Sequence, residues 1–258
     1  MLLKSTLLLA AAAASVQAAS IPIIPGNLEP RQQRALCELY GYWSGNGYEL
    51  LNNLWGRDTA TSGWQCTYLD GTNNGGIQWS SAWEWQGAPD NVKSYPYVGK
   101  QFQRGRKISD IRSMQTSVSW SYDRTDVRAN VAYDVFTARD PEHPNWGGDY
   151  ELMIWLARYG GIWPIGQVIA QVNLAGRNWD LYAGYNGNMR VYSFLPPNNA
   201  VGDIRNFSCD IKDFFNYLEQ NHGYPAREQN LIVYQIGTEC FTGGPAKFTC
   251  HNFKADLW

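Results

Sequence analysis

The sequence predicts an all-β fold in which two antiparallel sheets pack face to face and one amphipathic helix packs on a sheet. Apolar and polar residues alternate over ten segments, which is the pattern of half-buried strands. Turn clusters separate these segments, and 25 Gly, 12 Trp and 16 Tyr form a mixture that favours strands and tight turns over helices. Because no helical repeats lie between the strands, the pattern indicates a two-sheet sandwich.

The segments expected as strands cover residues 48–55, 77–85, 118–122, 128–136, 150–158, 165–174, 178–185, 189–194, 231–236 and 246–253. One segment breaks this pattern because its apolar residues recur at helical spacing; they are Ile211, Phe214, Phe215 and Leu218. Asp210 is expected to cap this helix at its start, and Gly223 with Pro225 to end it. The chain shows no internal repeat and no Ser/Thr/Pro-rich linker, so these elements are expected to form one domain.

The beginning of the chain has the pattern of a targeting segment. Lys4 precedes an apolar run over residues 7–14, and Val16-Gln17-Ala18 offers the small residues behind which signal peptidase cuts. Residues 1–18 are therefore expected to be a signal peptide, and the protein to be secreted and extracellular. A membrane anchor would need about 20 apolar residues, more than this run supplies. Prolines interrupt residues 21–34, so the folded part is expected to start near Leu36.

Charge and motif content exclude several classes of function. The 21 basic and 23 acidic residues are spread without runs, so neither nucleic acid nor a membrane surface is an expected partner. No two cysteines are spaced C-x-x-C, and His143, His222 and His251 stand alone, which argues against a metal site. A serine hydrolase would need G-x-S-x-G and a phosphate-binding loop would need G-x-x-x-x-G-K; the sequence has neither.

Five cysteines in an exported chain favour disulfides, and the odd number leaves at least one thiol over. Cys37 and Cys66 lie one hairpin apart. Cys240 and Cys250 flank a turn at residues 242–245 that would bring two strands side by side. The expected bridges are therefore Cys37–Cys66 and Cys240–Cys250, with Cys209 free.

Three of the expected strands carry a carboxyl group on a face whose reverse is apolar. Alternation places Glu151 beside Met153 and Trp155, and the aliphatic side chains of the same strand on the other side. In the same way Glu239 shares a face with Gln235, and Asp134 with Asn130. Strand carboxylates are more often solvated residues of an outer face, but the neighbours of these three include Met, Trp, Gly and Ala instead of Lys, Thr and Ser. A carboxyl group in such company has a raised pKa, as a general acid requires.

Several motifs around these residues resemble glycoside hydrolase family 12, the Humicola-type fungal cellulases in particular. They are Asn52-Asn53-Leu54-Trp55-Gly56, Tyr133-Asp134-Val135-Phe136, residues 148–156, Tyr159-Gly160-Gly161, Pro164-Ile165-Gly166 and Gly237-Thr238-Glu239-Cys240-Phe241. The resemblance runs in unbroken order from about Leu36 to Trp258. It implies a β-jelly roll, a concanavalin-like sandwich, with an open concave cleft for a β-1,4-glucan. It also implies a pro-segment at 19–31 and a single catalytic domain at 32–258, without a separate carbohydrate-binding module.

The resemblance assigns roles to the three carboxyl groups. It implies Glu151 as the nucleophile, Glu239 as the acid/base and Asp134 as the carboxyl beside the nucleophile, in a retaining double displacement that needs no cofactor. Trp55 is expected to stack on a sugar. The other residues expected to bind substrate are Asn53, Met153, Trp155, Asn130 and Gln235. In part of the family a proline replaces Cys240, so the Cys240–Cys250 bridge follows less directly from the resemblance than Cys37–Cys66 does.

Some alternatives stay open at the level of sequence. The expected function is an endo-acting β-1,4-glucanase that works as a monomer on cellulose and related β-glucans. A xyloglucan-specific enzyme of the same family, a sugar-binding lectin or a secreted protein recognised by host surfaces would use a similar surface. Asn206-Phe207-Ser208 is the N-glycosylation sequon of the chain.

Overall fold

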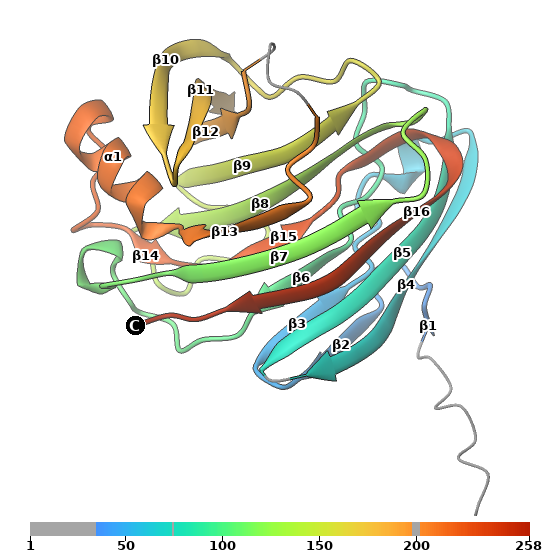
Figure 1. Cartoon of the computed structure of the whole chain (residues 1–258), viewed down its shortest axis with the longest axis horizontal. Helices are drawn as coiled ribbons and strands as arrows, with labels where there is room; N and C mark the ends of the chain where they lie inside the picture. Colours follow the sequence, from blue (N-terminus) through green and yellow to red (C-terminus); the bar gives the residue numbers. More distant parts are fainter. Residues whose placement is uncertain (1–34, 74, 198–201) are drawn as a thin grey trace, which may run out of the picture. The chain divides into compact units, whose positions relative to one another are not determined.

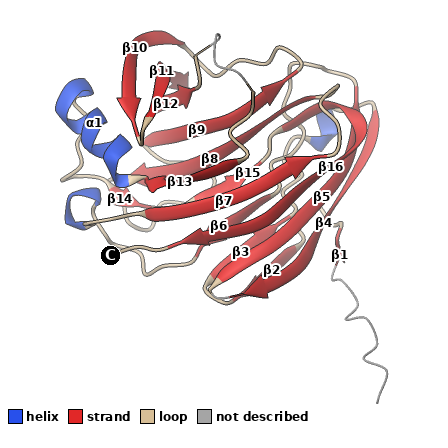
Figure 2. Cartoon of the chain, viewed as in Figure 1, coloured by secondary structure: helices blue, strands red, loops and turns tan. Residues whose placement is uncertain are grey.

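The computed structural model describes residues 35–73, 75–197 and 202–258, which belong to one compact unit that spans residues 33–258. The predicted signal peptide and pro-segment lie outside the described residues. Strands dominate this unit, and α1 (Lys212–His222) packs at one end of it (Figures 1 and 2). Two single-turn 3₁₀ helices, η1 (Arg57–Thr59) and η2 (Ile108–Asp110), lie between strands. The predicted all-β class with one helix is confirmed.

The first layer, sheet A, is antiparallel throughout. Its strands, in spatial order, are β1 (Ala35–Leu36), β4 (Ser62–Asn73), β5 (Gly76–Gln86), β16 (Cys240–Ala255), β7 (Gln115–Tyr122) and β13 (Asn206–Asp210). The longest of them, β16, lies between β5 and β7 (Figure 1). Sheet A forms one wall of the core.

The second layer, sheet B, holds the strands on which the carboxyl motifs lie. Its order is β2 (Tyr42–Gly45), β3 (Tyr48–Leu51), β6 (Tyr97–Lys100), β15 (Gln235–Gly237), β8 (Arg128–Ala138), β9 (Tyr150–Tyr159), β12 (Met189–Leu195), β11 (Arg177–Asn186) and β10 (Gln167–Leu174). The short β14 (Asn230–Leu231) also pairs with β8. The β9–β12 pair is parallel, unlike the antiparallel prediction. The hairpins β10–β11 and β11–β12 reverse the chain direction twice, so β12 runs in the same direction as β10 and as β9.

Strand β16 links the two sheets. Cys240 and Thr242 pair with β8 in sheet B, whereas the residues from Gly243 onward pair with β5 and β7 in sheet A. Gly243 and Gly244 have φ values of 112° and 103°, a region that residues with a Cβ rarely adopt. The segment expected to form a turn is therefore a bend inside one strand.

This bend decides the outcome for the cysteines. The Cys37–Cys66 disulfide is confirmed, with an S–S distance of 2.03 Å, and Cys209 is free as predicted. The Cys240–Cys250 bridge is wrong, because both residues are buried free thiols of the same strand. Ten residues of strand span roughly 30 Å, whereas a disulfide requires Cα atoms less than about 7 Å apart.

Large aromatic side chains fill the space between the sheets. Trp79, Trp83, Trp120 and Phe248 of sheet A are buried there, together with Tyr133 of β8. The indole of Trp83 donates a hydrogen bond to the Tyr122 hydroxyl at 3.0 Å, so its polar atom is satisfied within the core. Much of the aromatic surplus in the sequence therefore serves packing.

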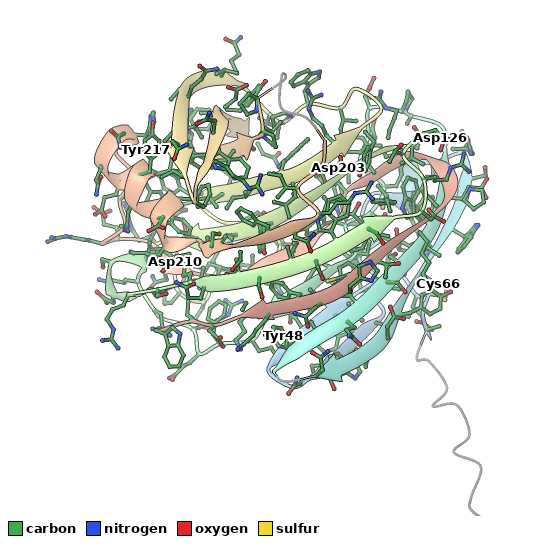
Figure 3. All side chains as sticks on the ribbon, viewed as in Figure 1. Tyr48, Cys66, Asp126, Asp203, Asp210 and Tyr217 are labelled. Carbon is green, nitrogen blue, oxygen red and sulfur yellow. A yellow bond between two sulfur atoms is a disulfide. The ribbon has the colours of Figure 1, made fainter. Side chains whose placement is uncertain are left out.

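Helix α1 closes one end of this core. The Phe214 ring lies 5.7 Å from the Trp179 ring of β11 and 4.9 Å from the Phe194 ring of β12. Asp210, labelled in Figure 3, is not the N-cap residue, which is Ile211, but its carboxylate accepts the N–H of Lys212 at 2.9 Å. Gly223 ends the helix in the left-handed conformation, as predicted. Across residues 35–73, 75–197 and 202–258, no helix is long and apolar enough to span a membrane.

Several strand boundaries differ from the prediction. The strand expected over 48–55 ends at Leu51, because Asn53 has a φ of 47° and turns the chain away from β3. The segment expected at 231–236 is divided between β14 and β15, and the strand expected from residue 165 begins at Gln167. The strands β1, β2, β4, β6 and β13 were not predicted, since their alternation is short or interrupted by glycines and turn residues.

Candidate active site

One face of sheet B, which we call the carboxyl face, carries the predicted acidic residues. Asp134 of β8 lies directly opposite Met153 of β9 and Gln235 of β15. Directly paired residues in antiparallel strands point to the same face, so these three side chains form a row across the strands. Glu151 lies two residues before Met153 and therefore on the same face.

The other face of β9 belongs to the core, as the alternation predicted. Leu152, Ile154 and Leu156 pack between the sheets, whereas Met153 and Trp155 belong to a separate apolar cluster on the carboxyl face. The other members of this cluster are Ala132, Ile162, Leu195 and Phe241. The Trp155 indole N–H donates to the Met153 sulfur at 3.4 Å. The carboxyl groups therefore lie beside apolar side chains.

Glu239, between β15 and β16, is held by Asn130 of β8 at three points. The Glu239 N–H donates to Asn130 Oδ1 at 2.9 Å, and the Asn130 N–H donates to the Glu239 carbonyl oxygen at 3.1 Å. The Asn130 side-chain amide also donates to Glu239 Oε2. Because Oδ1 already accepts the backbone N–H, the amide orientation is fixed. Asn130 therefore orients both the backbone and the carboxyl group of Glu239.

Burial dominates the electrostatics of the three carboxyl groups. Asp134 and Glu151 are only 7% and 8% exposed. Burial raises the pKa of Asp134 well above its ordinary value, and the charges of Glu151 and Glu239 raise it further. Burial and the charge of Glu239 also raise the pKa of Glu151. Burial raises the pKa of Glu239 to about 7, against the opposing effect of the Asn130 amide. The three carboxyl groups together therefore retain protons near neutral pH.

Two polar atoms in the row have no hydrogen-bond partner within the described part of the chain. They are Asp134 Oδ1 and Gln235 Nε2, both fully buried in adjacent strands. Unsatisfied buried polar atoms are uncommon in folded proteins and cluster at functional sites.

The predicted sugar-binding residues lie at different distances from this row. Met153, Trp155 and Gln235 lie in or next to it. Asn53 and Trp55 lie in the loop that follows β3, two strands beyond β15 in sheet B. A hydrogen bond fixes this loop, because the Tyr95 N–H donates to the Asn53 carbonyl oxygen at 3.0 Å. The Trp55 side chain on the same loop is 56% exposed.

Sequence reasoning missed two residues of the carboxyl face. The Tyr95 hydroxyl donates to the Ala132 carbonyl oxygen at 3.1 Å, and burial together with the charges of Asp134 and Glu239 raises the pKa of Tyr95. Glu49 of β3 lies opposite Gly99, which lies opposite Gln235, so it extends the row. Alternation in residues 48–51 signals that Glu49 faces away from the core, whereas no sequence pattern indicated Tyr95.

Similarity to known proteins is extensive. The glycosyl hydrolase family 12 model matches residues 46–258. Endoglucanase A of Aspergillus kawachii is 45% identical over 228 residues, which are 87% of this chain and 93% of that protein. Xyloglucan-specific endo-beta-1,4-glucanase A of Emericella nidulans is 42% identical over 225 residues, which are 84% of this chain and 90% of that protein.

Structural similarity agrees with these matches. The crystal structure of the catalytic domain of Humicola grisea Cel12A, in complex with a soaked thio cellotetraose, is 88% identical to this chain. The similarity covers 87% of this chain and 99% of that one, with a TM-score of 0.85. Together with the fold and the buried carboxyl groups on sheet B, these matches show that the chain is a glycoside hydrolase and belongs to glycosyl hydrolase family 12.

Proposed function

We propose that the chain is a secreted, monomeric endo-β-1,4-glucanase that cleaves internal bonds of cellulose and related β-glucans with retention of configuration. The observation that carries this proposal is the convergence of Asp134, Glu151 and Glu239 on one face of sheet B, with the pKa of each raised by burial. The apolar run at residues 7–14 and the Cys37–Cys66 disulfide support secretion.

In the first step, a carboxylate oxygen of Glu151 attacks the anomeric carbon. The bond from this carbon to the glycosidic oxygen breaks, and the proton of Glu239 passes to the leaving oxygen. The product is a glycosyl ester on Glu151. In the second step, water attacks the same carbon, Glu239 takes the proton of the water, and the ester bond to Glu151 breaks. Both carboxyl groups return to their initial states.

The chemistry requires an ionised Glu151 beside a protonated Glu239. Glu151 is buried and Glu239 is partly buried, and the two groups repel each other when charged, so the first proton to leave makes the second harder to remove. Asp134, whose ionisation is opposed by burial and by the charges of Glu151 and Glu239, is the group assigned to stay protonated and to stabilise the Glu151 carboxylate. A single negative charge shared by this set fits the resting state of a retaining glycosidase.

The substrate would lie across the strands of sheet B over the carboxyl face, as expected for an open cleft. Trp55 offers an exposed ring to a sugar, and its loop also presents Asn53. Met153, Trp155 and Gln235 would contact the sugars nearest the scissile bond. No cofactor takes part in either step.

A product profile on three polymers tests this function. We expect soluble cellulose and mixed-linkage β-glucan to lose viscosity well before reducing ends accumulate, because an endo-acting enzyme cuts inside the chain. Xyloglucan is the second candidate substrate, since the Emericella nidulans relative is named as specific for it. Activity confined to xyloglucan would favour that alternative. Binding without release of reducing ends from any of the three would favour a non-catalytic β-glucan-binding or host-recognised protein.

The pH dependence of cleavage tests the role of Asn130. Because the Asn130 amide lowers the pKa of Glu239, Asn130→Ala should raise that pKa above its wild-type value. A general acid with a higher pKa stays protonated to higher pH, so the alkaline limb of the kcat/KM profile should move upward from about pH 7.

The matched control is Asn173→Ala, which removes an exposed amide of β10 that is bonded to Asn178. Its profile should coincide with that of the wild type. An unchanged alkaline limb in Asn130→Ala, with kcat lowered at every pH, would show that Asn130 only supports the fold.

A further inference from the structure

A bulge in β9 returns a charged side chain to the carboxyl face. Val131 of β8 lies opposite Ala157, but Ala132 lies opposite Trp155, so β9 has one extra residue, Leu156. Leu156 and Ala157 both pack into the core, whereas Trp155 belongs to the cluster on the carboxyl face. The bulge therefore reverses the alternation, and Arg158 points to the carboxyl face.

Arg158 supports an exposed indole at the edge of this face. Its guanidinium carbon lies 3.6 Å from the centre of the Trp163 ring, and its Nη1 donates to the Ile162 carbonyl oxygen at 3.4 Å. The Tyr182 ring of β11 lies 6.1 Å from the Trp163 ring. Despite these contacts, 49% of the Trp163 surface is exposed. The ring is thus held in place, and about half of its residue's surface remains accessible.

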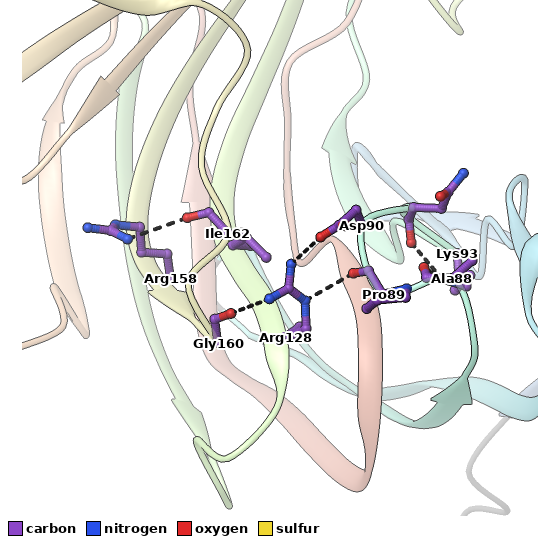
Figure 4. Close-up of polar contacts among 9 residues, drawn as sticks. Ala88, Pro89, Asp90, Lys93, Arg128, Arg158, Gly160 and Ile162 are labelled. Carbon is purple, nitrogen blue, oxygen red and sulfur yellow. Dashed lines mark hydrogen bonds and ion pairs between the residues drawn. The ribbon is translucent and has the colours of Figure 1, made fainter.

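A second arginine fixes the loop that carries Trp163. Arg128 of β8 donates from Nη1 to the Gly160 carbonyl oxygen at 2.5 Å, and from Nε to the Pro89 carbonyl oxygen at 3.0 Å (Figure 4). Its Nη2 forms an ion pair with Asp90 at 2.7 Å. Ile162 is buried in the apolar cluster of the carboxyl face. Residues 160–162 are therefore held at both ends, by the hydrogen bond to Gly160 and by the burial of Ile162. Trp163 follows this segment directly.

The strand order places Trp163 on the side of the carboxyl groups that is opposite to Trp55. Tyr182 lies opposite Ser193 of β12, and Ser193 pairs with Met153 of β9. Trp163 therefore borders the β11–β12 side of sheet B. Trp55 follows β3 on the other side, and the carboxyl groups come from β8, β9 and the end of β15, between these two sides.

We infer that Trp163 is a second sugar-stacking platform for the glucan chain, across the scissile bond from Trp55. The flat indole matches the C–H face of a pyranose, and the Arg158 guanidinium holds the ring at a fixed orientation. Arg128 and Arg158 are positioning residues that act through Trp163. This inference rests on the proposed glucanase function, and it extends the binding surface beyond the residues that the family resemblance indicated.

The position of cleavage in a labelled oligosaccharide tests this inference. Cellopentaose marked with ¹⁸O at its reducing end reports which bond is cut, because mass spectrometry separates labelled from unlabelled products. When one stacking ring is removed, a pentasaccharide should bind in a position shifted toward the side whose ring remains. Trp163→Ala and Trp55→Ala should therefore shift the preferred bond in opposite directions. Each should also lower kcat/KM by about tenfold, which corresponds to the loss of one ring contact.

Two further variants complete the experiment. Trp258→Ala, which removes an exposed indole at the C-terminus, should leave both the cleavage position and kcat/KM unchanged. Arg158→Met keeps the alkyl stem but removes the guanidinium, and it should shift cleavage in the direction of Trp163→Ala by a smaller amount. Equal melting temperatures would show that the exposed substitutions leave the fold intact.

The outcomes distinguish the platform from the function on which it rests. If Trp163→Ala cleaves at the wild-type position while Trp55→Ala shifts, or if both shift in the same direction, the platform is refuted and the glucanase function stands. If the wild type itself releases no product, the proposed function fails, and the platform fails with it.

Discussion

Glu151→Gln should bind cello-oligosaccharides with nearly the wild-type affinity while losing turnover on the order of 10⁴-fold. The substitution keeps the size of the side chain but removes the oxygen nucleophile, so no glycosyl ester can form. The carboxylate acts on the transition state much more than on the ground state, which is why binding survives. Calorimetric titration with cellotetraose and the rate of reducing-end release measure the two effects separately.

The matched control is Glu49→Gln, since Glu49 lies in the same row, is also buried in part and also has a pKa raised by burial. This variant should retain turnover within about tenfold of the wild type. Glu49 lies two strands away from Gln235 and is not one of the three carboxyl groups assigned to the reaction. Wild-type turnover in Glu151→Gln would remove Glu151 from the nucleophile role. It would also leave Glu49 and Asp134 as the remaining candidates on that face.

Glu239→Gln should lose about 10²- to 10⁴-fold of its activity on cellulose but much less on substrates with good leaving groups. An aryl cellobioside with an acidic phenol departs without a proton from the enzyme, so the first step proceeds. The second step still lacks its base. Azide, which attacks without giving up a proton, should therefore restore turnover and yield a β-glycosyl azide.

A series of aryl cellobiosides with phenols of different pKa checks this role. In the wild type the rate should depend weakly on the phenol, and in Glu239→Gln it should rise steeply as the phenol becomes more acidic. Equal slopes in the two proteins would exclude Glu239 as the group that protonates the leaving oxygen. The Asn130→Ala variant provides an internal comparison, because it keeps the acid and only removes the hydrogen bond to it.

The part of the site that follows the period of a strand was predictable from sequence. The alternation of residues 151–156 separated Glu151, Met153 and Trp155 from the core, and the structure confirms this separation. The helix at residues 212–222 was predictable for a similar reason, since it depends on local spacing. The Cys37–Cys66 bridge was predictable because the hairpin expected between the two cysteines brings them together. Local pattern is sufficient where a residue's direction depends only on its neighbours in the chain.

The remaining features depend on pairing between distant segments. The bend at Gly243 and Gly244 was interpreted as a turn between two strands. It lies within β16, at the point where this strand passes from sheet B to sheet A. This is why Cys240 and Cys250 were paired wrongly. The bulge at Leu156 cannot be read from alternation, because it exists only relative to β8. Tyr95 reaches the carboxyl groups through the pairing of other strands, and nothing in its own segment indicates this.

The central claim is that an enzyme carboxylate, and not water, attacks the sugar first. Proton NMR of a cello-oligosaccharide digest, recorded before mutarotation, tests this claim most directly. Two successive displacements at one carbon restore its configuration, so the β anomer should be the first reducing end to appear. This outcome requires the carboxyl groups of Glu151 and Glu239 to lie about 5 to 5.5 Å apart, too close for a water between them and the sugar. If the α anomer appears first, a single displacement by water has occurred, and Glu151 is a base instead of a nucleophile.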